Sequence, residues 1–344
     1  MKVNIAVLGA GAWGTTLASI LSDKKHGVTL WEFNPAQAEK IDKERKLSFF
    51  PVLKIPSDIT ITSNLKNACE GKDYILFAVP SHVLRSAAKQ LAQLKLDLSK
   101  TYIISAVKGI ENGTLKRMSE VLAEELGVKQ GDITVLSGPT IAKEVALKMP
   151  AAATAASKNL KASKLCQDLF MTPYFRIYTN TDTAGVEAGG ALKNVCAIAA
   201  GISDGLGMGN NAKSALITRG LRELAKLGIQ MGAEPSTMFG LSGLGDLIVT
   251  SFSPDSRNRQ LGEKLAAGKS VENAEREIIM VAEGVKTAQS AFELAKKFKL
   301  ELPIINQIYD IIYNHKAPKA ALQELMEREA KPELEPDEKA FNGL

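Results

Sequence analysis

The chain has 344 residues, of which 45% are hydrophobic and 24% charged, and its formal net charge is +5. Such values are ordinary for a globular protein, and the length suits two domains. The positive charge is spread along the chain, which favours small anionic ligands and argues against a nucleic-acid surface. The three cysteines are far apart and the three histidines are scattered, so the sequence predicts neither a disulfide framework nor a metal site.

The first segment, MKVNIAVLG, has the apolar pattern of a strand and leaves no room for a signal peptide. No apolar run approaches the roughly 18 residues that a membrane-spanning helix needs. We therefore expect a soluble protein of the cytoplasm that neither spans a membrane nor binds nucleic acid.

A glycine-rich turn follows the first predicted strand, at residues 3–8. A helical pattern comes directly after it, and this placement makes GxGxxG a strong dinucleotide-binding signal. The glycines allow a tight turn and let backbone N–H groups approach a pyrophosphate at the helix N-terminus. The predicted cofactor loop consists of Gly9, Gly11 and Gly14, with Ala10, Ala12 and Trp13 between them.

The second predicted strand, at residues 28–31, ends in Glu32, Phe33 and Asn34. An acidic residue about 20 positions after the glycines normally binds the ribose 2′-hydroxyl of NAD and repels the 2′-phosphate of NADP. Glu32 fits this position, and neither Phe33 nor Asn34 is basic. The sequence therefore favours NAD over NADP, with a solvated strand end as the alternative interpretation of Glu32.

Predicted strands alternate with helices as far as residue 178, the helical patterns including residues 83–94, 114–126 and 160–170. Such alternation predicts an α/β fold, a Rossmann-type doubly wound and mainly parallel sheet with helices on both faces. Ligands of such sheets gather beyond the carboxyl ends of the strands. The remaining predicted strands cover residues 59–62, 74–79, 102–106, 133–137, 152–156 and 175–178.

Two of these strand ends carry candidate binding residues. Lys108 follows the strand at 102–106 and places an ammonium group at the ligand edge, although surface lysines are common. SGPTIAKE follows the strand at 133–137, where Gly138 shapes a turn and Thr140 is predicted to cap the next helix. Free N–H groups at that turn could hold a substrate oxygen or phosphate.

From residue 182 onward the pattern is helical. We predict a dinucleotide-binding domain at residues 1–180 and an all-helical substrate domain at 181–330. A tail at 331–344, rich in proline and charge, is expected to be flexible. A glycine-rich loop is expected at 203–211.

The helix at residues 187–202 is apolar on nearly every face, with Lys193 and Asn194 at its centre. A buried lysine is unusual unless it is paired or functional, and burial near other cations lowers its pKa. Gly189 and Gly190 each cost this helix about 1 kcal/mol, which indicates that a backbone or a ligand approaches closely.

Basic residues lie at the start of a later predicted helix. Ser256 is expected to cap it, with Arg257, Asn258 and Arg259 in its first turn. Cations at this end oppose the helix dipole unless an anion is bound there. We therefore predict a phosphate or carboxylate site, with Asp246 at the start of the preceding apolar segment.

Several motifs follow one another along residues 3–330. They are GAGAWGT, Lys108-Gly109, SGPTIAKE, GALKNVCAIAAGISDGLGMGNNAKSALITRGL, SGLGDLIVT, SRNRQLG and AEGV at 282–285. Together they resemble the motifs of bacterial NAD(P)-dependent glycerol-3-phosphate dehydrogenases. This resemblance implies hydride transfer between sn-glycerol 3-phosphate and dihydroxyacetone phosphate with NAD or NADP, supplying glycerol 3-phosphate for glycerophospholipid synthesis.

The resemblance also implies roles for individual residues. Lys193 would accept or donate the proton, Lys108 would contact both cofactor and substrate, and Asp246 would support them. The implied substrate-binding positions are Gly138, Thr140, Asp246, Ser256, Arg257 and Asn258. The implied cofactor-binding positions are Trp13, Phe33, Ala142, Arg257, Val281 and Glu283.

The chain departs from the family pattern at two places. Ala12 stands where the family often has Ser, and no basic residue lies near Phe33, which puts an NADPH preference in doubt. Two other functions share parts of this pattern: a two-domain dehydrogenase acting on a 3-hydroxy acid or sugar phosphate, and a nucleotide-sensing protein without catalysis. SRNR together with SGLGDL argues against the first, and the two lysines argue against the second. We also expect a homodimer formed through the helical domain.

Overall fold

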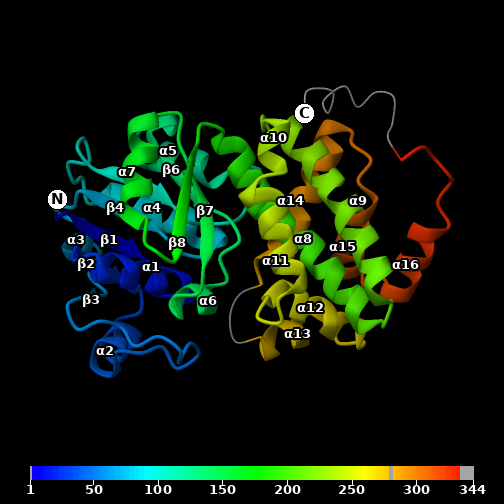
Figure 1. Cartoon of the computed structure of the whole chain (residues 1–344), viewed down its shortest axis with the longest axis horizontal. Coiled ribbons are helices and arrows are strands. Elements are labelled where there is room, and N and C mark those ends of the chain that lie inside the picture. Colours follow the sequence, from blue (N-terminus) through cyan, green and yellow to red (C-terminus); the bar gives the residue numbers. More distant parts are fainter. Residues whose placement is uncertain (1, 279–281, 334–344) are drawn as a thin grey trace.

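The computed structural model describes residues 2–278 and 282–333. It has two parts, a sheet flanked by helices and an all-helical part, which lie side by side in Figure 1. Among the described residues, no helix is long and apolar enough to cross a membrane.

The first part is built on one eight-stranded sheet, in the order β3-β2-β1-β4-β5-β6-β7-β8. Neighbouring strands are parallel except β6 and β7, which pair antiparallel. This confirms the predicted fold class. The strands are β1 (Asn4–Leu8), β2 (Gly27–Trp31), β3 (Thr60–Thr62), β4 (Tyr74–Phe77), β5 (Tyr102–Ser105), β6 (Thr134–Ser137), β7 (Ala151–Ala156) and β8 (Phe175–Asn180).

Helices cover both faces of this sheet. In β1, Ile5 and Val7 pack into one apolar cluster, whereas Ala6 and Leu8 pack into another on the opposite face. A strand buried on both faces reads as a continuous apolar run, as β1 does. The helices here are α1 (Ala12–Asp23), α2 (Pro35–Glu44), α3 (Leu65–Cys69), η1 (Ser81–Val83), α4 (Leu84–Gln93), α5 (Met118–Leu126), η2 (Gln130–Asp132), α6 (Ala142–Ala146) and α7 (Leu160–Phe170).

The second part is organised around α8, which is buried along most of its length. Glycines let α12 cross it closely, because a Cβ at Gly201 would lie 2.0 Å from the Arg259 carbonyl oxygen, and one at Gly262 would lie 2.1 Å from that of Ile198. The elements are α8 (Thr183–Gly205), α9 (Gly209–Gln230), α10 (Pro235–Met238), the π-helical turn η3 (Leu241–Gly245), α11 (Asp246–Phe252), α12 (Arg257–Ala266), α13 (Val271–Glu277), α14 (Glu283–Phe298), α15 (Pro303–Tyr313) and α16 (Pro318–Met326).

All eight predicted strands are present, with ends within two residues of those predicted. Two other predictions were wrong. The loop expected at 203–211 is short, because α8 continues to Gly205 and α9 begins at Gly209. The helix expected from residue 114 begins only at Met118, because Arg117 pairs with Ile110 in an isolated β-bridge. The predicted tail lies largely outside the described residues.

Candidate active site

Two lysines from different parts of the fold meet at one buried carboxylate. Asp246, the first residue of α11, is 1% exposed. Lys193 of α8 places Nζ 3.0 Å from Oδ1 of Asp246, and Lys108, beyond the end of β5, places Nζ 2.5 Å from Oδ2. The predicted proton-transfer residue, Lys193, and the two residues predicted to support it therefore lie together.

Glycines bring these elements into register. A Cβ at Gly189 would lie 2.8 Å from the Ser242 carbonyl oxygen, so α8 touches the backbone of η3, which leads directly into Asp246. A Cβ at Gly190 would lie 2.4 Å from Oγ of Ser137 and 3.7 Å from the Lys108 side chain. The close approach of another backbone is confirmed at Gly189, whereas at Gly190 the close neighbours are side chains. The approach at Gly189 places Lys193, one turn after that glycine, against Asp246.

Burial and neighbouring charges set the protonation of this centre. Burial lowers the pKa of Lys193 to about 8; Lys108 and Arg257 act in the same direction, whereas Asp246 opposes them. Burial alone would raise the pKa of Asp246, but the two lysines outweigh it and hold this pKa below its ordinary value. Near neutral pH, Lys193 can therefore exchange a proton beside a carboxylate that stays ionised.

Thr250 belongs to the same centre, and sequence reasoning missed it. Lys193 donates a hydrogen bond of 2.6 Å to Oγ1 of Thr250, which in turn donates one of 3.0 Å to Oδ1 of Asp246. Thr250 is buried and lies four residues after Asp246 on α11. This spacing puts two side chains on one helix face, so it could have identified Thr250.

The turn after β6 supports Lys108. Nζ of Lys108 donates to the carbonyl oxygen of Gly138 at 2.9 Å and lies 3.5 Å from Oγ1 of Thr140. Gly138 has a φ of +152°, and a Cβ there would lie 2.8 Å from Cα of Ala153, so only glycine fits. The prediction that Thr140 caps a helix was wrong: α6 begins at Ala142, and Thr140 donates to Gly138 instead.

A hydroxyl group below this turn was also missed. Oγ of Ser137 is buried and has no hydrogen-bond partner among the residues that the structure describes. It lies 2.4 Å from the position of a Cβ at Gly190, and Cγ of Lys108 lies 3.7 Å from the same position. A buried polar atom without a partner is uncommon and indicates that a ligand or water completes the site.

The basic segment forms the first turn of α12. Ser256 caps this helix, as predicted, by accepting the N–H of Arg259 at 3.3 Å. Arg257 is partly buried; burial lowers its pKa, Glu283 opposes that effect, and the charge of Arg257 reaches Lys193. Arg259 turns away to bind Asp204 at 2.7 Å. The cationic end of the site therefore depends on Arg257 and the start of α12.

Asn258 connects three helices at this point. Its Nδ2 donates to Oδ1 of Asn194 on α8 at 2.8 Å, and its Oδ1 accepts the N–H of Gly284 on α14 at 2.9 Å. Asn194, the second polar residue in the centre of α8, thus holds the start of α12 beside Lys193.

The glycine loop has the shape that a dinucleotide needs. Gly9 has a φ of +117°, and a Cβ at Gly14 would lie 2.0 Å from the Gly9 carbonyl oxygen, so the turn is tight. A Cβ at Gly11 would meet open space. Gly11 caps α1 without a side-chain acceptor, and the first turn holds no acidic residue, so its N–H groups can bind a pyrophosphate.

Trp13 lies in that first turn of α1. Its Nε1 is buried without a hydrogen-bond partner among the described residues, and its ring meets Phe175 edge-on at 6.2 Å. Ala12 is buried beside it and begins α1. The observed residues therefore fit a dinucleotide at this loop.

The other predicted cofactor residues lie apart from one another along the sheet edge. Glu32 accepts the N–H of Asn34 at 3.2 Å, and Phe33 is 73% exposed. Glu283 begins α14 and accepts hydrogen bonds from the N–H and Oγ of Ser81, at 3.0 and 2.5 Å. Val281 lies outside the described residues. Burial raises the pKa of Glu32, and its hydrogen bond to Asn34 opposes that rise.

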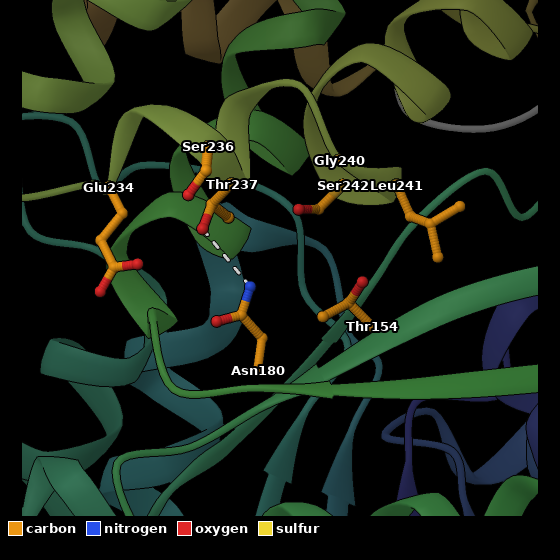
Figure 2. A pocket seen from close by; sticks show the side chains of 8 residues that line it. All are labelled: Thr154, Asn180, Glu234, Ser236, Thr237, Gly240, Leu241 and Ser242. Carbon is orange, nitrogen blue, oxygen red and sulfur yellow. Dashed lines mark hydrogen bonds between the residues drawn. The ribbon is translucent and has the colours of Figure 1, made fainter. Parts of the chain in front are cut away.

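A separate pocket of about 200 Å³ also lies at the junction between the two parts. Figure 2 shows it between the ends of β7 and β8 and the segment of α10 and η3, with Asn180 donating to Thr237 at 3.4 Å. None of its eight described lining residues is basic or belongs to the predicted site. They are Thr154, Asn180, Glu234, Ser236, Thr237, Gly240, Leu241 and Ser242.

Comparison with known proteins identifies the family. The family model for the NAD-dependent glycerol-3-phosphate dehydrogenase N-terminus matches residues 4–163, and that for its C-terminus matches residues 182–323. The chain belongs to this family of dehydrogenases. Its members are NAD(P)-dependent oxidoreductases, so the predicted class of enzyme and the predicted cofactor, NAD or NADP, are both confirmed.

Individual relatives are similar to this chain over nearly its whole length. A glycerol-3-phosphate dehydrogenase of Fusobacterium nucleatum, named for NAD(P)+, is 44% identical over 97% of this chain and 99% of its own. The protein of the same name from Geobacillus kaustophilus is 47% identical over 96% of each chain. The crystal structure of glycerol-3-phosphate dehydrogenase from Coxiella burnetii is 38% identical and superimposes with a TM-score of 0.89, over 95% of this chain and 99% of that one.

Proposed function

We propose that the chain interconverts sn-glycerol 3-phosphate and dihydroxyacetone phosphate, with Lys193 as the group that moves the proton. The observation that supports these roles is the convergence of Lys193 and Lys108 on the buried carboxylate of Asp246. When bound, the nicotinamide cofactor gives or takes the hydride at the central carbon.

In the reductive direction, negative charge develops on the ketone oxygen, which therefore needs a proton donor. The ammonium group of Lys193 donates this proton and becomes a neutral amine. In the oxidative direction, the neutral amine takes the proton of the hydroxyl group. Asp246 and Thr250 hold Nζ of Lys193 in place through both steps.

Lys108 has a supporting role in this mechanism. Its charge lowers the pKa of Lys193 and would stabilise the developing oxyanion from the sheet side of the site. The carbonyl oxygen of Gly138 and the carboxylate of Asp246 orient its ammonium group, with Thr140 beside it.

The phosphate group would bind at the start of α12. Arg257 supplies a guanidinium group, and the first N–H groups of α12 supply the positive end of the helix dipole. Ser256 caps this turn, and Asn258 holds it against α8 and α14.

The residues that would hold the cofactor are those of the glycine loop and the adjoining sheet edge. The N–H groups after Gly11 bind the pyrophosphate, and Glu32 binds the ribose hydroxyls. A carboxylate at that position repels a 2′-phosphate, so we propose NAD as the preferred cofactor. Phe33, Ala142, Val281 and Glu283 are proposed to complete the cofactor site.

We also propose a division of the chain into two domains, a location in the cell and an oligomeric state. Residues 1–180 bind the cofactor, and residues 181–330 complete the substrate pocket. The chain acts in the cytoplasm as a homodimer and supplies glycerol 3-phosphate for glycerophospholipid synthesis.

The purified protein can be tested by following NADH absorbance with dihydroxyacetone phosphate as the substrate. We expect rapid NADH oxidation with this phosphate and none with unphosphorylated dihydroxyacetone. With NAD+ and 3-hydroxy acids we expect no NADH formation. Equal activity with the unphosphorylated ketone would contradict the phosphate site, and no activity with any of them would contradict the proposed reaction.

A further inference from the structure

A buried carboxylate outside the active site joins the two parts of the molecule. Glu187 of α8 is 5% exposed. Its Oε1 accepts the N–H of Ser119 at 2.7 Å, and its Oε2 accepts Oγ of Ser119 at 2.6 Å and Nη1 of Arg117 at 3.1 Å. Burial raises the pKa of Glu187, whereas the charge of Arg117 and the hydrogen bonds from Ser119 oppose that rise. Three donors therefore face this carboxylate and favour its ionised form.

The partners of Glu187 lie at the start of a helix of the first part. Ser119 is the second residue of α5, so its N–H is one of the free donors of a helix N-terminus. The positive end of that helix dipole also favours a carboxylate there. Glu187 therefore caps α5 from another helix.

The Glu187 contact links the two chain segments that carry the lysines of the site. Glu187 precedes Lys193 on α8 by less than two turns. Arg117 and Ser119 end the connection that begins with Lys108 after β5. Lys193 and Lys108 also meet at Asp246. The segment from Lys108 to Ser119 is therefore linked to α8 near both of its ends, through Asp246 at one end and through Glu187 at the other.

The Lys108 connection makes other contacts between these two points. Ile110 packs into the apolar core of the helical part, and Asn112 donates to Gln289 of α14 at 3.0 Å. Glu111 binds Arg85 of α4 at 2.8 Å, which orients the connection on the side of the sheet. The contact between Arg117 and Glu187, in contrast, is a buried ion pair that joins the Lys108 connection to α8, the helix of Lys193.

A rigid support is needed because two ammonium groups share one carboxylate. Their mutual repulsion in a buried site favours their separation. A shift of about 1 Å in a reacting group can lower a rate by about 100-fold. We propose that Glu187 is a positioning residue, which fixes α8 against the Lys108 connection and thereby holds Lys193 at Asp246. This inference rests on the proposed role of Lys193.

The variant Glu187→Gln tests this inference, with Glu223→Gln as its matched control. Glu223 is also a buried carboxylate that caps another helix, because it accepts the N–H groups of Ile304 and Ile305 at 2.8 and 3.0 Å. It joins two helices within the second part only. A carboxamide at position 187 would turn an N–H group toward Arg117 or Ser119 and weaken the contact.

We expect Glu187→Gln to lower kcat by about 10- to 100-fold, with the KM for dihydroxyacetone phosphate within about threefold of the wild-type value. Glu223→Gln should leave kcat within about twofold, even where the two variants lose similar amounts in Tm. Equal losses of kcat at equal Tm would reduce Glu187 to a stability role and overturn the proposal.

A second readout needs no substrate. The pKa of Lys193 can be measured from the pH dependence of its reductive methylation, quantified by mass spectrometry. Separation from Asp246 removes the charge that raises this pKa, so we expect it to fall by about one unit in Glu187→Gln and to stay unchanged in Glu223→Gln. An unchanged Lys193 pKa in Glu187→Gln would overturn the inference, whatever substrate the wild-type protein uses.

Ser119→Ala provides a milder variant in case Glu187→Gln does not fold. It removes one hydroxyl donor and keeps the N–H and Arg117, so a smaller fall in kcat and in the Lys193 pKa is expected. A folded Ser119→Ala protein with both quantities unchanged would contradict the proposal.

Discussion

Lys108 and Lys193 bind opposite oxygens of the same carboxylate, that of Asp246, although one lysine follows a strand of the sheet and the other lies in the central helix of the helical part. The site is therefore assembled at the junction between the two parts. A nicotinamide at the sheet edge and a phosphate at α12 would both lie within reach of this junction.

Replacing Lys193 should remove the proton donor without disturbing the glycine loop. We expect Lys193→Met to lower kcat by about 10²- to 10⁴-fold, as for the loss of a general acid, with the Kd for NADH little changed. Lys213→Met is the matched control, because Lys213 is a buried lysine paired with Asp204 at 2.7 Å outside the site. Calorimetry for NADH and steady-state kinetics measure the two quantities. Near-normal turnover in Lys193→Met would remove Lys193 from proton transfer.

The pKa of Lys193, about 8, predicts that kcat/KM depends on pH in opposite ways for oxidation and for reduction. Oxidation needs the neutral amine, so its kcat/KM should rise with pH through about 8. Reduction needs the ammonium group, so its kcat/KM should fall above about 8. In Asp246→Asn the charge that raises the pKa is lost, and both limbs should move to lower pH. Limbs that stay in place in this variant would show that another group titrates.

Arg257→Ala should weaken substrate binding rather than the chemical step. Loss of a charge-assisted contact costs about 1.5–3 kcal/mol, which corresponds to a rise in KM of about 10- to 100-fold. Arg259→Ala, two residues later, is the control, because Arg259 binds Asp204 and Glu263. Steady-state kinetics with dihydroxyacetone phosphate measure both. The phosphate assignment is wrong if Arg259→Ala raises KM more than Arg257→Ala does.

The choice of cofactor depends on the charge of Glu32. In Glu32→Gln the repulsion of a 2′-phosphate is removed, so we expect the affinity for NADPH to rise by about 10-fold or more relative to that for NADH. Glu39→Gln makes the same charge change on the exposed side of the neighbouring α2 and should leave the ratio unchanged. Kd values from calorimetry decide this without an activity assay. A wild-type preference for NADPH would contradict the assignment.

Glu223 should make stability depend on pH. Burial raises its pKa to about 7 from an ordinary 4.5, although two helix N–H groups oppose the rise. The folded state therefore binds more protons than the unfolded state between these values, and the contribution of Glu223 to the free energy of unfolding should fall as pH rises from about 4.5 to 7. The difference between wild type and Glu223→Gln should change by about 3 kcal/mol across this window. Chemical denaturation at several pH values measures it, and a constant difference would contradict the raised pKa.

Features that depend on neighbouring residues could be predicted from the sequence. The turn from Gly9 to Gly14, the cap at Ser256 and the apolar strands are all decided within a few positions, and all were predicted correctly. The extra helical turn that shortens the loop after Ile202 was not, because its glycines suggested a break that packing against α12 overrides.

Features that depend on distant residues could not be predicted in the same way. Lys108 and Asp246 lie 138 positions apart, and only the family resemblance suggested that they act together. Ser119 and Glu187 lie 68 positions apart, and nothing in either local pattern indicates their contact. Thr140 was misassigned because a threonine before a helix usually caps it, whereas here its hydroxyl binds the turn that holds Lys108.

The glycine crossing of α8 and α12 has a consequence for substrate size. Backbone lies against backbone at Gly201 and Gly262, so the two helices cannot move closer, and Asn258 keeps them from moving apart. The backbone of α8 at Lys193 is therefore held at a set distance from the start of α12. With the phosphate bound at α12 as proposed, a phosphate ester with a longer carbon chain would not place its carbonyl group at the amine at the same time, so the helix pair would limit the length of the substrate.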